Sequence, residues 1–183
     1  MRAMLIAIPI VAALAVGCSS MAGQAATTTT GPPEDITMQA RDFVSLKDMT
    51  PVRGFFVENQ LGHLDQTLAV AANPDGGAYP VGTVIQLVPQ EAMVKRRAGY
   101  DAGSDDWEFF NLDVSATGTK IVTRGGAEVI NRFGGSCSSC HKAADPKFDF
   151  VCEHDHGCEP LPIGDDVIRG IQQADPRPHR TSS

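Results

Sequence analysis

Hydrophobic and polar residues alternate over the middle of the chain, a pattern typical of half-buried β-strands. Residues 107–114 carry bulky side chains between polar ones, and residues 119–124 (Thr-Lys-Ile-Val-Thr-Arg) suit a partner strand. The residues between these runs, 115–118, favour a hairpin connection because Gly118 tolerates a positive φ. Residues 83–88 are β-branched and apolar and predict a further strand. We therefore expect antiparallel strands in the centre of the chain.

The segments around these strands are less regular. Residues 38–49 are weakly helical in pattern and end before Pro51. Residues 66–72 favour a strand that ends in a turn, and residues 90–97 have helical composition, although a short connection between strands suits them equally. The sum predicts an α+β fold that is mainly β, with an antiparallel sheet and a few short helices.

The start of the chain has the features of a secretion signal. Residues 1–17 place Arg2 before an apolar run that is too short to anchor the chain in a bilayer. The residues before Cys18 resemble a bacterial lipobox, so we expect Cys18 to be lipidated; an ordinary signal cut near Ala22 or Ala26 is the alternative. Either way we expect export to the periplasmic side of a bacterial envelope, with membrane contact through the lipid anchor only.

Composition suggests how the remainder is divided. Residues 18–35 contain almost no bulky apolar side chains, which predicts a disordered tether. Residues 36–166 are long enough for one core, and we expect residues 167–183 to be a flexible tail. The formal net charge of −7 argues against nucleic acid as a partner.

Residues 137–141 read Cys-Ser-Ser-Cys-His, which is the attachment motif of a c-type haem. One helical turn brings Cys137 and Cys140 onto the same side, where each thiol can add to a porphyrin vinyl group. His141 is then placed to coordinate the iron. A redox Cys-x-x-Cys pair and half of a zinc site are the alternatives. Zinc would need a second pair, and the later two cysteines have an atypical five-residue gap, so haem c is favoured.

The remaining cysteines are Cys152 and Cys158. In an oxidising compartment, two cysteines this close are expected to form a disulfide. The loop between them holds His154 and His156, which are weak candidates for a second metal; an exposed polar loop is favoured because metal sites need three or four convergent ligands. A proton relay near the haem is a further alternative.

Several motifs, in this order, resemble the cytochrome P-460 family, which includes the cytochrome c-prime-beta proteins. Residues 80–83 (Pro-Val-Gly-Thr) resemble the family's strand entry, residues 106–109 (Asp-Trp-Glu-Phe) its central strand, and residues 149–151 (Asp-Phe-Val) the segment after its haem motif. The resemblance covers about residues 57–151. It implies a long twisted antiparallel sheet that holds the haem on one face, near the C-terminal end.

The resemblance also implies roles for individual residues. Cys137 and Cys140 would be the thioether attachments and His141 the proximal ligand, with the opposite face of the iron open. Enzymatic members oxidise hydroxylamine and carry a lysine cross-linked to the porphyrin, whereas c-prime-beta members lack it and bind gases such as nitric oxide. Here Gln86 and Leu87 stand where that lysine is expected. The next lysine is Lys95, for which a solvated cluster or a haem propionate partner is favoured over a cross-link.

These observations predict an exported mono-haem c-type cytochrome that binds or redox-transforms a small nitrogen species, nitric oxide or hydroxylamine. The missing lysine weakens the hydroxylamine oxidase reading. A periplasmic electron carrier with no substrate of its own is the alternative, and each reading requires a redox partner protein or a small ligand. Glu91, Glu108 and His63 are weaker candidates for a polar group near the iron, and structural or surface roles are favoured for them.

Overall fold

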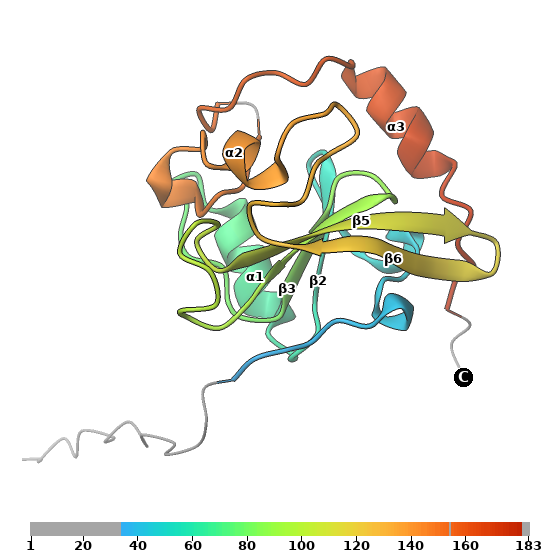
Figure 1. Cartoon of the computed structure of the whole chain (residues 1–183), viewed down its shortest axis with the longest axis horizontal. Helices are drawn as coiled ribbons and strands as arrows, with labels where there is room; N and C mark the ends of the chain where they lie inside the picture. Colours follow the sequence, from blue (N-terminus) through green and yellow to red (C-terminus); the bar gives the residue numbers. More distant parts are fainter. Residues whose placement is uncertain (1–33, 154, 181–183) are drawn as a thin grey trace, which may run out of the picture. The chain divides into compact units, whose positions relative to one another are not determined.

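The computed structural model describes residues 34–153 and 155–180 (Figure 1). The expected signal at residues 1–17, the lipidation site Cys18 and nearly all of the expected tether lie outside the described residues. His154 does too. Among the described residues, no helix is long and apolar enough to cross a membrane.

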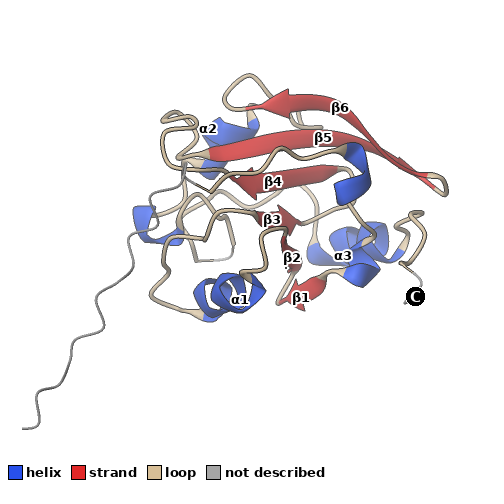
Figure 2. Ribbon diagram, turned by 90° about the horizontal axis from the view of Figure 1, so that it is seen from below, coloured by secondary structure: helices blue, strands red, loops and turns tan. Residues whose placement is uncertain are grey.

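A six-stranded antiparallel sheet forms the centre of the domain, with its strands side by side in chain order (Figure 2). The strands are β1 (Thr50–Val52), β2 (Phe55–Asn59), β3 (Thr83–Gln86), β4 (Glu91–Lys95), β5 (Trp107–Ser115) and β6 (Gly118–Gly125). Strands β5 and β6 pair as the expected hairpin, with Ser115 opposite Gly118. The prediction of a mainly β protein with an antiparallel sheet is confirmed.

Short helices surround the sheet. The α-helices are α1 (Leu64–Ala72), α2 (Cys137–His141) and α3 (Asp165–Gln173), and the 3-10 helices are η1 (Ala40–Asp42), η2 (Leu46–Asp48) and η3 (Pro146–Phe148). The haem-attachment motif is therefore a helix of its own, α2.

The two faces of the sheet carry separate apolar cores because successive side chains of a strand point to opposite faces. One core, which we call the motif face, joins strand residues such as Ile85, Met93 and Phe109 to α1 and to Cys137. The other, the N-terminal face, joins the alternate strand residues, such as Val94, to the segment around η1 and η2. The motif and its neighbours in sequence thus belong to one side of the sheet.

Two sequence predictions of local structure were wrong. Residues 66–72, expected as a strand, belong to α1, whose residues Leu64, Leu68 and Ala71 turn toward the motif face. Residues 90–97, for which a helix and a short connection between strands were equally expected, contain the strand β4, which pairs with both β3 and β5. Pairing on both edges outweighs the weak helical preference of this short segment.

The expectation of a flexible tail at residues 167–183 also has to be corrected. Helix α3 covers Asp165–Gln173 and buries Ile168, and the chain beyond it is fixed by a buried ion pair between Asp175 and Arg177. Asp175 accepts a hydrogen bond from the backbone N–H of Leu46 at 2.8 Å. The folded part likewise includes Asp35, which was assigned to the tether and is ion-paired to Arg96 at 2.9 Å.

Candidate haem site

Helix α2 begins at a capped N-terminus that ties the motif to the preceding loop. The Ser136 hydroxyl accepts a hydrogen bond from the N–H of Ser139 and donates one to the carbonyl of Ala127 at 2.8 Å. The N–H of Cys137 donates to the carbonyl of Val129 at 2.9 Å. These contacts fix the first turn of the helix, which carries both cysteines.

The two motif cysteines are free thiols in different surroundings. Cys137 is buried in the core of the motif face, whereas Cys140 is exposed. Burial raises the pKa of the Cys137 thiol to about 11, so this group stays protonated at neutral pH. The Cys137 thiol therefore lies within the apolar core of the motif face, and the Cys140 thiol is exposed to solvent.

His141 is held by one hydrogen bond from its ring. Nδ1 lies 2.7 Å from the carbonyl oxygen of Phe150, and because a carbonyl only accepts, Nδ1 carries the proton. Nε2 is left as the nitrogen with a lone pair, which is the form that binds a metal. Burial lowers the pKa of His141, with the Phe150 carbonyl opposing, so the imidazole is neutral at pH 7. Its ring packs beside Phe109 at 5.2 Å between centroids.

This donor set fits a c-type haem. Two free thiols lie one turn apart on a helix, and the next residue offers a neutral, oriented imidazole. Among the described residues, no group of three or more His, Cys, Asp or Glu side chains converges as a metal site. These two thiols and this imidazole are the groups that would hold a c-type haem, whose ring would supply the other iron ligands.

The segment after the motif has an unusual backbone. Asp149 and Phe150 both have positive φ, 50° and 64°, although neither is glycine. The Asp149 carboxylate holds this turn by accepting hydrogen bonds from the N–H of Tyr79 at 2.7 Å and from Lys95 Nζ at 2.5 Å. The indole N–H of Trp107 donates to the Asp149 carbonyl at 2.8 Å.

The ammonium group of Lys95 therefore already has partners within the protein. Its ammonium group is ion-paired to Asp149, donates to the carbonyl of Asp105 at 2.8 Å and lies 5.2 Å from the Trp107 ring centroid. It is neither in a solvated cluster nor free, because its side chain is only 12 % exposed. A porphyrin cross-link through Lys95 would require this pairing to break, because the nitrogen would leave Asp149.

Gln86 and Leu87, at the positions expected for a cross-linking lysine, lie on opposite faces of the sheet. Leu87 packs with the motif-face core. Gln86 is buried, and its amide donates to the carbonyls of Pro89 and Glu91 at 3.2 Å each. Leu87, which directly follows β3 and packs against the motif-face core, is thus apolar and has no nucleophile.

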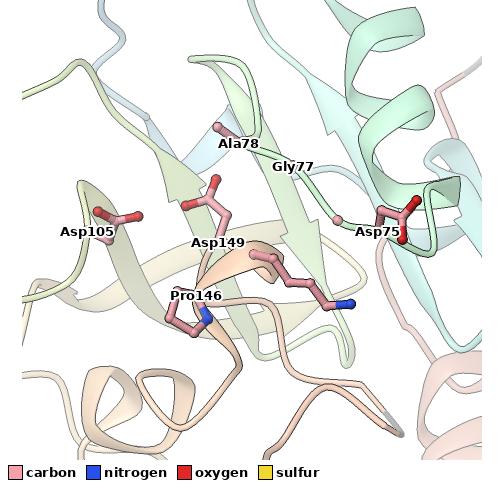
Figure 3. A pocket seen from close by; sticks show the side chains of 8 residues that line it. Asp75, Gly77, Ala78, Asp105, Pro146 and Asp149 are labelled. Atoms are coloured by element: carbon pink, nitrogen blue, oxygen red, sulfur yellow. The ribbon is translucent and has the colours of Figure 1, made fainter.

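A cavity of about 270 Å³ adjoins the segment after the motif (Figure 3). Its lining combines the loop after α1 with η3 and the Asp149 turn. The lining residues are Asp75, Gly76, Gly77, Ala78, Asp105, Pro146, Lys147 and Asp149. Burial raises the pKa of Asp149 to about 6, with Lys95 opposing this shift.

The expected disulfide between Cys152 and Cys158 is present, with an S–S distance of 2.00 Å. Within its loop Asp155 and Gly157 are exposed, as expected for a polar loop, whereas Glu153 and His156 are only partly exposed. The His156 ring stacks on Phe148 at 3.5 Å between centroids, and its Nδ1 donates to the carbonyl of Val151 at 2.8 Å. His156 is therefore engaged in packing, and nothing near it in the described chain completes a second metal site.

The weaker polar candidates differ in their positions: Glu91, on the same face of β4 as Met93, lies near enough to Cys137 to add to the rise in the pKa of that thiol after burial, whereas the others do not. Glu108 is on the N-terminal face, where it is ion-paired to Arg96 and Arg124, so the sheet separates it from the motif. His63 is paired with Glu34 at 3.0 Å, and Glu91 accepts from the N–H of Arg132. None of these hydrogen-bonding partners is a motif residue.

Comparison with known proteins adds no relative: no family model, no curated protein and no solved structure matches this chain. The resemblance to the cytochrome P-460 family stays a prediction that rests on the residues quoted for it.

Proposed function

We propose that the chain is an exported mono-haem c-type cytochrome, with haem c attached through Cys137 and Cys140 and its iron bound by His141. The observation that carries this proposal is the arrangement of α2. Two free thiols lie one turn apart, and His141 keeps Nε2 available because Nδ1 is hydrogen-bonded to Phe150. When bound, the haem supplies one-electron chemistry and a site for small ligands.

The chain's own residues have distinct tasks in this proposal. Cys137 fixes one attachment within the apolar core, and Cys140 fixes the other near solvent. The Phe150 carbonyl orients His141 and keeps its proton on Nδ1. Phe109, beside the imidazole ring, and the rest of the motif-face core exclude water from that side.

A small nitrogen species is the proposed ligand, nitric oxide before hydroxylamine. The support is the resemblance to the cytochrome P-460 family together with the apolar Leu87 where a cross-linking lysine is expected. The absence of that lysine favours ligand binding over hydroxylamine oxidation. The second candidate is a periplasmic electron carrier. It is favoured if the iron is already six-coordinate in the purified protein.

Location in the bacterial envelope is proposed from the chain start and from the cysteines. A disulfide at Cys152–Cys158 suits an oxidising compartment, which is also where c-type haem is attached. The signal at residues 1–17 and lipidation of Cys18 would retain the domain at a membrane, within reach of a redox partner protein.

The test is the visible spectrum of the full chain produced in a bacterium that attaches c-type haem. We expect covalently bound haem in the wild type, its loss in the Cys137→Ala/Cys140→Ala double variant, and an altered spectrum in His141→Ala. The matched control is Cys152→Ser, which removes a cysteine outside the motif and should retain haem. A change in the reduced spectrum on adding nitric oxide supports the open-site function, and an unchanged low-spin spectrum supports the electron carrier.

A further inference from the structure

We infer that Lys95 and Asp149 are positioning residues, which tune the iron ligand His141 by holding the Phe150 carbonyl in place. The inference rests on the proposed function, because it concerns how the haem iron is bound. It assigns a role to an ion pair that joins β4 to the segment after the motif.

Several hydrogen bonds fix the position of the Asp149 carboxylate. Its carboxylate side chain is 5 % exposed and is contacted by three separate elements of the fold. Lys95 donates to Oδ1 at 2.5 Å, the Trp107 indole donates to the same oxygen at 3.2 Å, and the N–H of Tyr79 donates to Oδ2 at 2.7 Å. A buried carboxylate with these donors has one position, since charge-assisted hydrogen bonds are short and directional.

The contacts of Asp149 also restrain the backbone of its neighbour Phe150. Both residues adopt left-handed backbone conformations, which non-glycine residues adopt only when surrounding contacts require it. The preceding backbone is held as well, because Gly77 donates its N–H to the Lys147 carbonyl at 2.8 Å. Gly76 allows this approach, since a Cβ there would lie 2.1 Å from the Lys147 oxygen. Release of the Asp149 side chain removes one of the restraints on the backbone that carries the Phe150 carbonyl; the hydrogen bond from the Trp107 indole to the Asp149 carbonyl is another.

The position of the Phe150 carbonyl affects how strongly His141 would donate electrons to iron. The Phe150 carbonyl accepts a hydrogen bond from the Nδ1–H of His141, with 2.7 Å between Nδ1 and the oxygen, and a stronger acceptor makes Nε2 a better electron donor to iron. A donor of this kind stabilises the ferric state. Loosening the carbonyl should therefore weaken the bond from His141 to iron and shift the redox equilibrium toward the ferrous form.

An ion pair of the residue just after β4 offers a matched comparison. Arg96 follows Lys95 directly, and its guanidinium is paired with Glu108 at 2.5 Å. This pair is also buried, with side chains 8 % and 3 % exposed, but it lies on the N-terminal face, away from α2. Removing Arg96 should reduce stability without altering the spectrum of the iron.

The experiment compares full-chain holoprotein of the wild type, Asp149→Asn, Lys95→Met, Lys95→Arg and Arg96→Met. The measurements are covalent haem content, the redox midpoint and the iron–histidine stretching band of the ferrous protein by resonance Raman spectroscopy. Asp149→Asn and Lys95→Met should lower the stretching frequency and shift the ferric–ferrous equilibrium about tenfold toward the ferrous form. Lys95→Arg, which keeps the charge, should restore most of the wild-type behaviour, and Arg96→Met should leave both signals unchanged.

The outcomes separate this inference from the proposed function. Wild-type protein without covalent haem would overturn both. Haem in every variant, with the iron–histidine band and the midpoint unchanged in Lys95→Met, would overturn the inference alone. Equal shifts in Arg96→Met and Lys95→Met would also overturn it, because a general loss of stability would then explain the change. If Asp149→Asn yields no folded protein, the two Lys95 variants decide the matter.

Discussion

Replacement of Arg177 by methionine should destabilise the domain more than any change to an exposed charge. Arg177 and Asp175 form an ion pair whose side chains are 1 % and 0 % exposed. The Arg177 guanidinium also approaches the amide oxygen of Gln86 at 3.4 Å, and Asp175 accepts from the N–H of Leu46. The pair thus fastens the end of the chain to β3 and to η2, the 3-10 helix before the sheet.

The magnitude follows from the burial of the pair. Removing one partner leaves the other charge without compensation, at a cost of about 3–5 kcal/mol in the free energy of unfolding. Burial opposes ionisation of Asp175, but hydrogen bonds from Arg177 and Leu46 outweigh it and hold the pKa of Asp175 below its ordinary value. The stabilisation is therefore present above the unfolded-state pKa and is lost as the pH falls through the lower, folded-state pKa.

The assay is urea unfolding of the full chain, followed by far-UV circular dichroism. With a denaturant slope of about 2 kcal/mol per molar, Arg177→Met should lower the midpoint by about 2 M. The control is Arg169→Met in α3, whose ion pair with Asp166 is exposed and should contribute less than about 1 kcal/mol. Equal midpoints for Arg177→Met and the wild type would refute the assignment of the C-terminal segment to the folded core.

Three further predictions concern the region after the motif. The folded-state pKa of Asp149, about 6, lies above its unfolded value, so its stabilisation is full below about pH 4 and is lost as the pH rises through 6. Relative to Asp149→Asn, wild-type unfolding free energy should therefore fall by up to about 3 kcal/mol between pH 4 and pH 7, and parallel pH profiles would contradict this. Replacing Cys152 and Cys158 with serine should cost about 2 kcal/mol by calorimetry, given the short loop that they close; no change in melting temperature would count against it. Gly76→Ala should cost more than about 1 kcal/mol in urea unfolding, because its Cβ meets the Lys147 carbonyl, and wild-type stability would show that the loops separate freely.

Sequence patterns predicted β5 from its alternation of bulky and polar residues, β6 as its hairpin partner across Gly118, and β3 from its β-branched, apolar residues. Helix α1 was missed although Leu64, Leu68 and Ala71 follow helical spacing, since its apolar composition suited a strand equally. The C-terminal segment was missed for a different reason. Its polar residues looked solvated, and the contact that buries Asp175 comes from Leu46, 129 positions earlier.

In the candidate site, too, the residues of the local motif could be predicted from the sequence, whereas contacts between distant residues could not. Cys137, Cys140 and His141 are a local motif whose spacing carries its own chemistry. The Phe150 carbonyl carries no side-chain signal, and the pairing of Lys95 with Asp149 joins residues 54 positions apart. No pattern in a single sequence indicates such a pairing, because it depends on strand register and on how η3 packs against the sheet.

The central claim is covalent haem at α2, and intact mass spectrometry of the purified full chain, with thiol labelling, tests it most directly. We predict one haem added per chain, unlabelled Cys137 and Cys140, and a haem-bearing peptide that contains both residues. A mass without haem, with both thiols open to labelling after production in a host that attaches c-type haem, would contradict the account.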